Sequence, residues 1–137
     1  MARTNLPLAT FTSGADLNDV GTSVDQANGM NVVLASGAMP SALGSEGLFL
    51  YVTNTAGTTQ TVIVRKGVGG GVTPGAAMRS GIGDYTTGNL SATTGTAFIG
   101  PFDPMRFAQA DGSLNIDFSS GFTGKIWAVL LPPAPLI

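Results

Sequence analysis

Hydrophobic residues in this chain occur in short runs, and each run ends at glycine, asparagine, aspartate or serine. The two clearest runs cover residues 48–54 and 60–66, and a turn-forming segment with glycine separates them. Runs of this length that are rich in β-branched and aromatic residues are typical of β-strands. The pair predicts a β-hairpin in which alternate residues from Leu48 share one face, opposite Val62 and Val64.

The same signals predict further strands along the chain. These strands are expected at residues 30–34, 96–99, 106–109, 114–118 and 125–131, with a short edge strand or arm at 8–12 and an interrupted strand at 84–90. The Asp-Gly pair at 111–112 favours a hairpin turn after residue 109. The last run is apolar without a break, which predicts a central strand covered on both faces. Residues 22–25 are polar and indicate a turn.

This pattern predicts an all-β fold, an antiparallel β-sandwich or jelly roll with extended N- and C-terminal arms. Twenty glycines and eight prolines are spread along the chain and interrupt every candidate helical period. A length of 137 residues fits one domain, residues 1–137. The N-terminal arm is expected at residues 1–7, and the proline-rich tail at residues 132–137 is expected to be extended.

The chain carries few charged residues, and this limits the classes of partner that it can bind. Charged residues make up 10% of the chain, against about 25% in typical proteins, and the net charge is −2. No basic stripe is present, which argues against nucleic acid and anionic membrane as partners. A weakly charged surface suits large contacts with other subunits. No signal peptide or membrane-spanning run is evident, so we expect the protein in the cytoplasm.

Residues for catalysis are scarce. The chain has no histidine and no cysteine, which removes the commonest general base, metal ligand and nucleophile. The glycine-rich segment at 67–75 has Val72 where a dinucleotide-binding loop needs glycine. Gly124-Lys125 follows Ser119 rather than the glycine of a phosphate-binding loop. The sequence therefore predicts a protein that is not an enzyme and that holds no cofactor or metal.

Three less favoured hypotheses about sites remain open from the sequence alone. Asp103, Asp111 and Asp117 suggest a calcium site, although alternating polar residues on an exposed strand explain the pattern more simply. Glu46 leaves room for carboxylate hydrolysis, although a solvated loop acid is the simpler reading. Trp127 is either a platform for sugar or, on an apolar strand, a core residue.

Several segments resemble small structural proteins encoded beside the capsid genes of tailed bacteriophages. They are Phe-Ile-Gly-Pro-Phe at 98–102, Arg-Phe-Ala-Gln-Ala-Asp-Gly-Ser-Leu-Asn-Ile-Asp-Phe at 106–118, Val-Thr-Asn-Thr at 52–55, Val-Ile-Val at 62–64 and Ala-Arg-Thr-Asn-Leu-Pro at 2–7. The resemblance implies a capsid decoration (cement) or other head accessory protein that binds the outer surface of the shell and stabilises contacts between its subunits. It also implies a β-rich fold, no cofactor, and a homo-oligomer, with a trimer favoured.

On this reading the major capsid protein is the partner, and the protein resides in the host cytoplasm before assembly and on the capsid surface afterwards. The residues expected to contact the partner lie in the two arms: Arg3, Leu6, Pro7, Pro133, Pro135, Leu136 and Ile137. Arg65, Lys66, Arg79 and Arg106 are candidates to pair with acidic shell residues. The alternative is a tail- or fibre-associated β-sandwich that binds host-surface glycan through Tyr85, Phe102 and Phe122.

Overall fold

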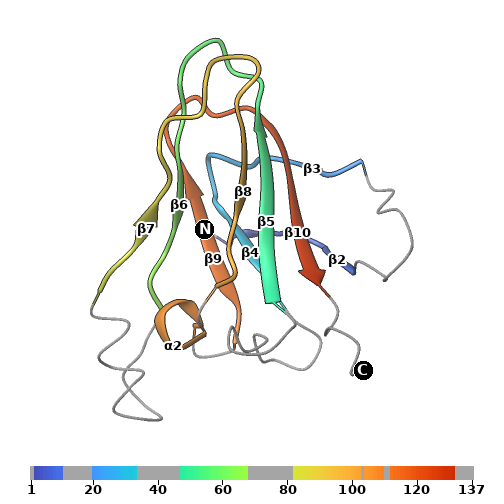
Figure 1. Ribbon diagram of the computed structural model, residues 1–137, viewed down its shortest axis with the longest axis vertical. Coiled ribbons are helices and arrows are strands. Elements are labelled where there is room, and N and C mark those ends of the chain that lie inside the picture. Colours follow the sequence, from blue (N-terminus) through green and yellow to red (C-terminus); the bar gives the residue numbers. More distant parts are fainter. Residues whose placement is uncertain are drawn as a thin grey trace, which may run out of the picture.

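The chain folds into two mixed β-sheets, as the computed structural model in Figure 1 shows. The structure describes residues 2–10, 20–33, 47–67, 82–102, 104–109 and 112–131. The elements are β1 (Thr4–Asn5), β2 (Leu8–Thr10), β3 (Thr22–Ser23), β4 (Met30–Val32), β5 (Gly47–Asn54), β6 (Val62–Val64), β7 (Tyr85–Thr86), β8 (Thr96–Ile99), α2 (Pro104–Phe107), β9 (Leu114–Phe118) and β10 (Gly124–Leu131).

The first sheet has the strand order β1-β4-β9-β6-β7, and the second has the order β2-β10-β5-β8, with β3 also paired to β10. Both sheets follow the two-residue alternation of the sequence, because successive side chains of a strand point to opposite faces. In β9, Leu114, Ile116 and Phe118 are buried while the residues between them are half-buried. A single core cluster draws on both sheets, including Leu50 from β5 and Val62 from β6. The predicted all-β chain is confirmed.

The predicted hairpin between residues 48–54 and 60–66 is wrong. Both strands form, but β5 belongs to the second sheet and β6 to the first, so the intervening turn carries the chain from one sheet to the other. Buried Asn54 fixes this crossing. Its Nδ2 lies 3.0–3.2 Å from the carbonyl oxygens of Thr58, Leu90 and Ser91, and its Oδ1 accepts a bond from the Ala56 amide. Burial of an amide is tolerated only with such partners.

The prediction of purely antiparallel pairing is also wrong. β1 runs parallel to β4, and β2 runs parallel to β10. Residues 4–10 therefore contribute a strand to each sheet, and Leu6 between them is only 1% exposed. The Leu6 amide donates to the carbonyl of Asn31 at 2.8 Å. The expected N-terminal arm at residues 1–7 is thus built into the fold, because burial of an apolar side chain holds the segment against its own domain.

Residues 106–109 do not form the predicted strand. Instead, Pro104–Phe107 is the short helix α2, which starts at a proline whose fixed φ suits a first helical turn. Phe107 is buried edge-to-face against Phe102, with ring centroids 5.5 Å apart. The predicted tight turn after residue 109 is supported at both of its ends: the Gly112 amide donates to the carbonyl of Gln109, the Gln109 amide donates to the carbonyl of Ser113, and Gly112 has the expected positive φ of +84°. Residues 110 and 111 lie outside the described residues, and the turn follows a helix rather than the predicted strand.

The remaining strand predictions at 30–34, 96–99, 114–118 and 125–131 are confirmed within one or two residues as β4, β8, β9 and β10. β10 is an inner strand of its sheet, as its apolar run predicted. The polar segment at 22–25 was expected to be a turn, yet its first half is β3. No helix in the described part of the chain is long and apolar enough to span a membrane.

Candidate interaction surface

The outer face of the second sheet carries four aromatic side chains. The register pairs Phe98 of β8 with Tyr51 of β5, and Tyr51 with Trp127 of β10, so the three residues form one row across the sheet. Phe49, two residues before Tyr51, lies on the same face because side chains alternate along a strand. We call Phe49, Tyr51, Phe98 and Trp127 the aromatic face.

The four rings contact one another. Phe49 and Phe98 are stacked with centroids 4.9 Å apart and planes inclined by 13°. Tyr51 is tilted against Trp127, at 5.3 Å, and against Phe98, at 6.5 Å. Phe98 is nevertheless 58% exposed, and the other three rings are only half-buried. Because the four rings pack on one another, they are held in fixed positions. The aromatic face is therefore a preformed apolar surface that remains open to water.

Gly21 positions one end of the aromatic face. Its φ of +76° is unfavourable for residues with a Cβ. A Cβ at this position would lie 2.6 Å from the indole ring of Trp127, inside van der Waals contact. Glycine therefore lets the backbone before β3 lie directly against the ring. Val20, the preceding residue, is 87% exposed and extends the apolar character of this end.

The outer face of the first sheet is ionic. Asp117 of β9 lies between two guanidinium groups, with Arg3 Nη1 2.6 Å from its Oδ1 and Arg65 Nε 2.7 Å from its Oδ2. Arg65 also contacts Asp84 at 2.8 Å, which continues the chain of charges to the start of β7. We call Arg3, Asp117, Arg65 and Asp84 the ionic chain. It connects segments that are far apart in sequence.

These contacts lower the pKa of both carboxyl groups below their ordinary values. For Asp117 the hydrogen bond from Arg3 is the main cause, assisted by the positive charges of Arg3 and Arg65 and opposed by partial burial. For Asp84 the main cause is the hydrogen bond from the Lys66 backbone amide, again opposed by partial burial. The ionic chain therefore stays charged at neutral pH, with two positive and two negative members.

Of the arm residues predicted to contact a partner, the structure describes only the three near the N-terminus. Arg3 is bound to Asp117, Leu6 lies in the core, and Pro7 is exposed. The other predicted contact residues, Pro133, Pro135, Leu136 and Ile137, lie outside the described residues, as does Arg79.

The aromatic residues expected to bind glycan separate into two kinds. Phe102 and Phe122 are 2% and 3% exposed, so the expectation that they present open rings is wrong. Phe122 packs on Phe118, and Phe102 packs on Phe107, which removes both rings from water. Tyr85 is 40% exposed and does reach the surface.

The hypothesis of a calcium site has little support among the residues that the structure describes. Both oxygens of Asp117 are taken up by arginine, and Asp103 and Asp111 lie outside the described residues, as does Glu46. Among the residues that the structure describes, no group of three or more acidic, histidine or cysteine side chains is placed to hold a metal ion.

The sequence reasoning missed most of the aromatic face. Trp127 was expected to be either a platform for sugar or a core residue; it points outward between buried Ile126 and Ala128 and is half-buried. The alternation of β10 was hidden because inward and outward positions are both apolar. A signal was present in β5, where Phe49 and Tyr51 alternate with Leu48, Leu50 and Val52 and were expected to lie on a partly covered face.

Comparison with known proteins adds no name: no family model, no curated protein and no solved structure matches this chain.

Proposed function

We propose that the chain is a non-enzymatic virion protein that binds the outer surface of a phage capsid and stabilises contacts between shell subunits. The observation that carries the proposal is the aromatic face, a preformed and weakly charged surface on the second sheet. Interfaces are enriched in aromatic residues and depleted of charge at their centre. The sequence resemblance to phage head accessory proteins supplies the identity of the partner, the major capsid protein.

In this proposal the two sheets form a β-sandwich or jelly roll, with the aromatic face directed at the shell. Phe98 is the central anchor, because it is the most exposed of the four rings and is held in place by Phe49. A few such anchors supply most of the free energy of a typical interface. Homo-oligomers, with a trimer favoured, repeat the contact over a symmetric lattice and so raise the overall affinity.

Only part of the two arms is still proposed to contact the shell. Pro7 and the apolar tail at 132–137 remain candidates for contacts between neighbouring shell subunits. Arg3 and Leu6 are assigned a different role, which is to hold the N-terminal segment on its own domain through Asp117 and the core.

The test is binding to shells that lack this chain, measured by co-sedimentation. Phe98→Ser is expected to weaken binding by about tenfold or more, because it removes the proposed anchor. Ile82→Ser is the matched control, since Ile82 is an apolar residue with 67% exposure that is not part of the aromatic face. Equal binding by both variants and the unmodified protein would exclude the aromatic face as the shell contact.

Counting copies in purified particles of the phage that encodes the chain tests its location. A copy number comparable to that of the shell protein supports decoration of the whole lattice. A few copies per particle point instead to the neck, tail or fibre, and absence from the particle overturns the virion proposal.

A further inference from the structure

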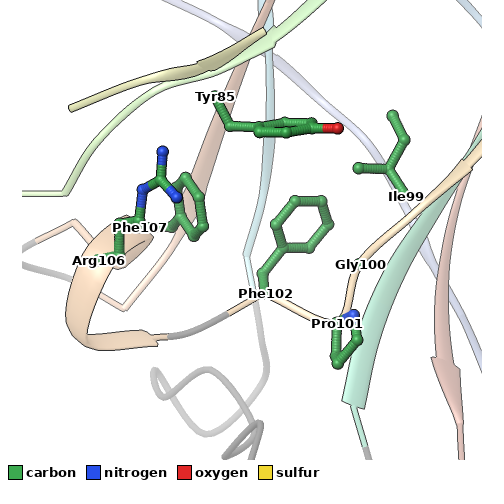
Figure 2. Close-up of a pocket in the computed structure, with 7 residues that line it drawn as sticks. All are labelled: Tyr85, Ile99, Gly100, Pro101, Phe102, Arg106 and Phe107. Atoms are coloured by element: carbon green, nitrogen blue, oxygen red, sulfur yellow. The ribbon is translucent and has the colours of Figure 1, made fainter. Parts of the chain in front are cut away.

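A pocket of about 240 Å³ lies beside the aromatic face but shares no residue with it. Its walls come from β7, the end of β8 and α2, and the residues that line it are Tyr85, Ile99, Gly100, Pro101, Phe102, Arg106 and Phe107 (Figure 2). β7 and β8 are edge strands of the two sheets. The volume is below the roughly 300–1,000 Å³ of sites for drug-sized ligands, so it fits a single ring.

The lining residues are mostly aromatic or apolar in type, but Phe102 and Phe107 are only 2% and 6% exposed, so Tyr85, at 40%, is the ring that a ligand can reach. Figure 2 shows the rings of Tyr85 and Phe102 on two sides of the pocket, with Phe107 beside Arg106 on a third. Phe102 and Phe107 are held edge-to-face, so this part of the wall is preformed. A ligand with an apolar ring face can therefore pack on the exposed ring of Tyr85, while Phe102 and Phe107 support the pocket from the core.

Arg106 supplies the one positive charge among the described residues that line the pocket. Its guanidinium lies 4.6 Å from the centre of the Phe107 ring, which fixes its plane. Nε donates to the carbonyl of Gly83 and Nη2 to that of Asp84, whereas Nη1 donates to no residue that the structure describes.

The three arginines of the described segments differ in their charge partners. Arg3 and Arg65 each bind a carboxylate, but no described carboxylate lies within ion-pair distance of Arg106. A guanidinium that stacks on an aromatic ring and has a donor that no described residue accepts from is suited to bind a carboxylate. The hydroxyl of Tyr85, on the opposite side, adds a hydrogen-bonding group for a second polar substituent.

From this combination we infer that the pocket binds an acidic sugar residue, a single pyranose ring that carries a carboxylate. The carboxylate pairs with Arg106, the C–H face of the sugar ring packs on the ring of Tyr85, and a sugar hydroxyl bonds to the Tyr85 hydroxyl. This inference does not depend on the shell-binding proposal, because the pocket and the aromatic face share no residue.

The experiment is a titration of the full chain with D-glucuronate, followed by chemical-shift changes in NMR spectra. D-glucose and acetate are titrated in parallel, since the first lacks the carboxylate and the second lacks the ring. Glucuronate is expected to bind at least about tenfold more tightly than either, with shifts concentrated at Tyr85, Phe102 and Arg106. Equal binding of glucose or of acetate, or no binding of glucuronate, would overturn the inference.

Variants separate the pocket from general charge effects. Arg106→Gln is expected to weaken glucuronate binding by about tenfold or more, and Tyr85→Phe by a few-fold, with both variants checked for folding by thermal unfolding. Arg106→Lys keeps the charge and should retain part of the affinity even if Arg106→Gln fails to fold. Lys66→Gln removes one exposed positive charge outside the pocket and should bind like the unmodified chain. A similar loss in Lys66→Gln, or tighter binding of a glutamate-rich peptide than of glucuronate, would refute a sugar site.

Discussion

The two sheets of this protein present outer faces of opposite chemistry. The second sheet carries the aromatic face, in which four rings contact one another and Phe98 is mostly exposed. The first sheet carries the ionic chain, in which each charged group already has a partner of opposite sign. The strand alternation is the same in both sheets, so the difference lies only in which side chains occupy the outward positions.

This difference separates stability from binding. The ionic chain joins segments of its own domain, and its contacts weaken with salt and with protonation of the carboxylates. The aromatic face retains apolar area that water still reaches, and burial of that area by a partner depends little on salt. We therefore assign stabilisation of the domain to the outer face of the first sheet, and partner binding to the outer face of the second.

The largest loss of stability is expected from Gly21→Ala, because the added methyl group would displace the Trp127 ring of the aromatic face. The left-handed backbone costs alanine about 1–2 kcal/mol, and displacement of the Trp127 ring adds about 1–3 kcal/mol. Trp127 is the only tryptophan in the chain, so its fluorescence should also shift to longer wavelength as the ring moves into water. Denaturant unfolding followed by this fluorescence measures both effects.

Gly57→Ala is the control for that substitution. Nothing lies within 4 Å of a Cβ at this exposed glycine, and its φ is not in the left-handed region. A change of less than about 0.5 kcal/mol is expected. If the two alanine variants unfold alike, close packing of Gly21 on Trp127 does not stabilise the aromatic face.

A smaller loss is expected when the ionic chain is cut in its middle. Asp117→Asn should lower the free energy of unfolding by roughly 1–2 kcal/mol, since Arg3 loses its charge partner and Arg65 keeps only Asp84, while water still reaches the site. Asp84→Asn, at the more exposed end with one arginine partner, should cost less. An equal loss in both variants would contradict a central role for Asp117.

Lowering the pH should destabilise the first sheet, as Asp117→Asn is expected to do. The folded-state pKa of Asp117 is below its ordinary value of 3.8, so its contribution to stability is present above that pH and is lost as pH falls through the folded pKa. The loss is expected to be no larger than that of Asp117→Asn. Thermal unfolding from neutral pH to below the ordinary value should show a smaller acid-induced fall in Asp117→Asn than in the unmodified chain.

The smallest effect on stability is expected from Phe98→Ser, although this is the variant proposed to lose shell binding. The ring is mostly exposed, so its removal should cost less than about 1 kcal/mol, chiefly the stacking on Phe49. Denaturant unfolding in low and high salt should show the same small loss in each. A loss comparable to that of Gly21→Ala would mean that the ring serves the fold rather than a partner.

Much of the strand content was predictable because alternation along a single strand is a local property. Leu114, Ile116 and Phe118 identified β9 and its buried face without any knowledge of neighbours. The pairing of β5 was not predictable in the same way. A turn with Gly57 fits a hairpin, and only the carbonyl groups of Leu90 and Ser91, brought to Asn54 by the fold, select a crossing between sheets.

The candidate site was less predictable than the fold. Burial of Phe102 depends on Phe107, which enters the core through a helical turn that the sequence pattern read as a strand. Arg106 stands in the same turn, so its place in the pocket was hidden for the same reason. The N-terminal residues were expected to form an arm that contacts a partner, but Leu6 is buried in a core to which both sheets contribute, and a local pattern does not reveal that core.

The parallel pairing of β2 with β10 has a consequence for biosynthesis. β10 lies between β5 and the two early strands β2 and β3, and it is the last described strand in the sequence. A ribosome releases residues 8–10 long before residues 128–130 with which they pair. The second sheet therefore cannot close until translation has passed residue 131, and until then β2, β3 and β5 remain unpaired along the edges that β10 will occupy.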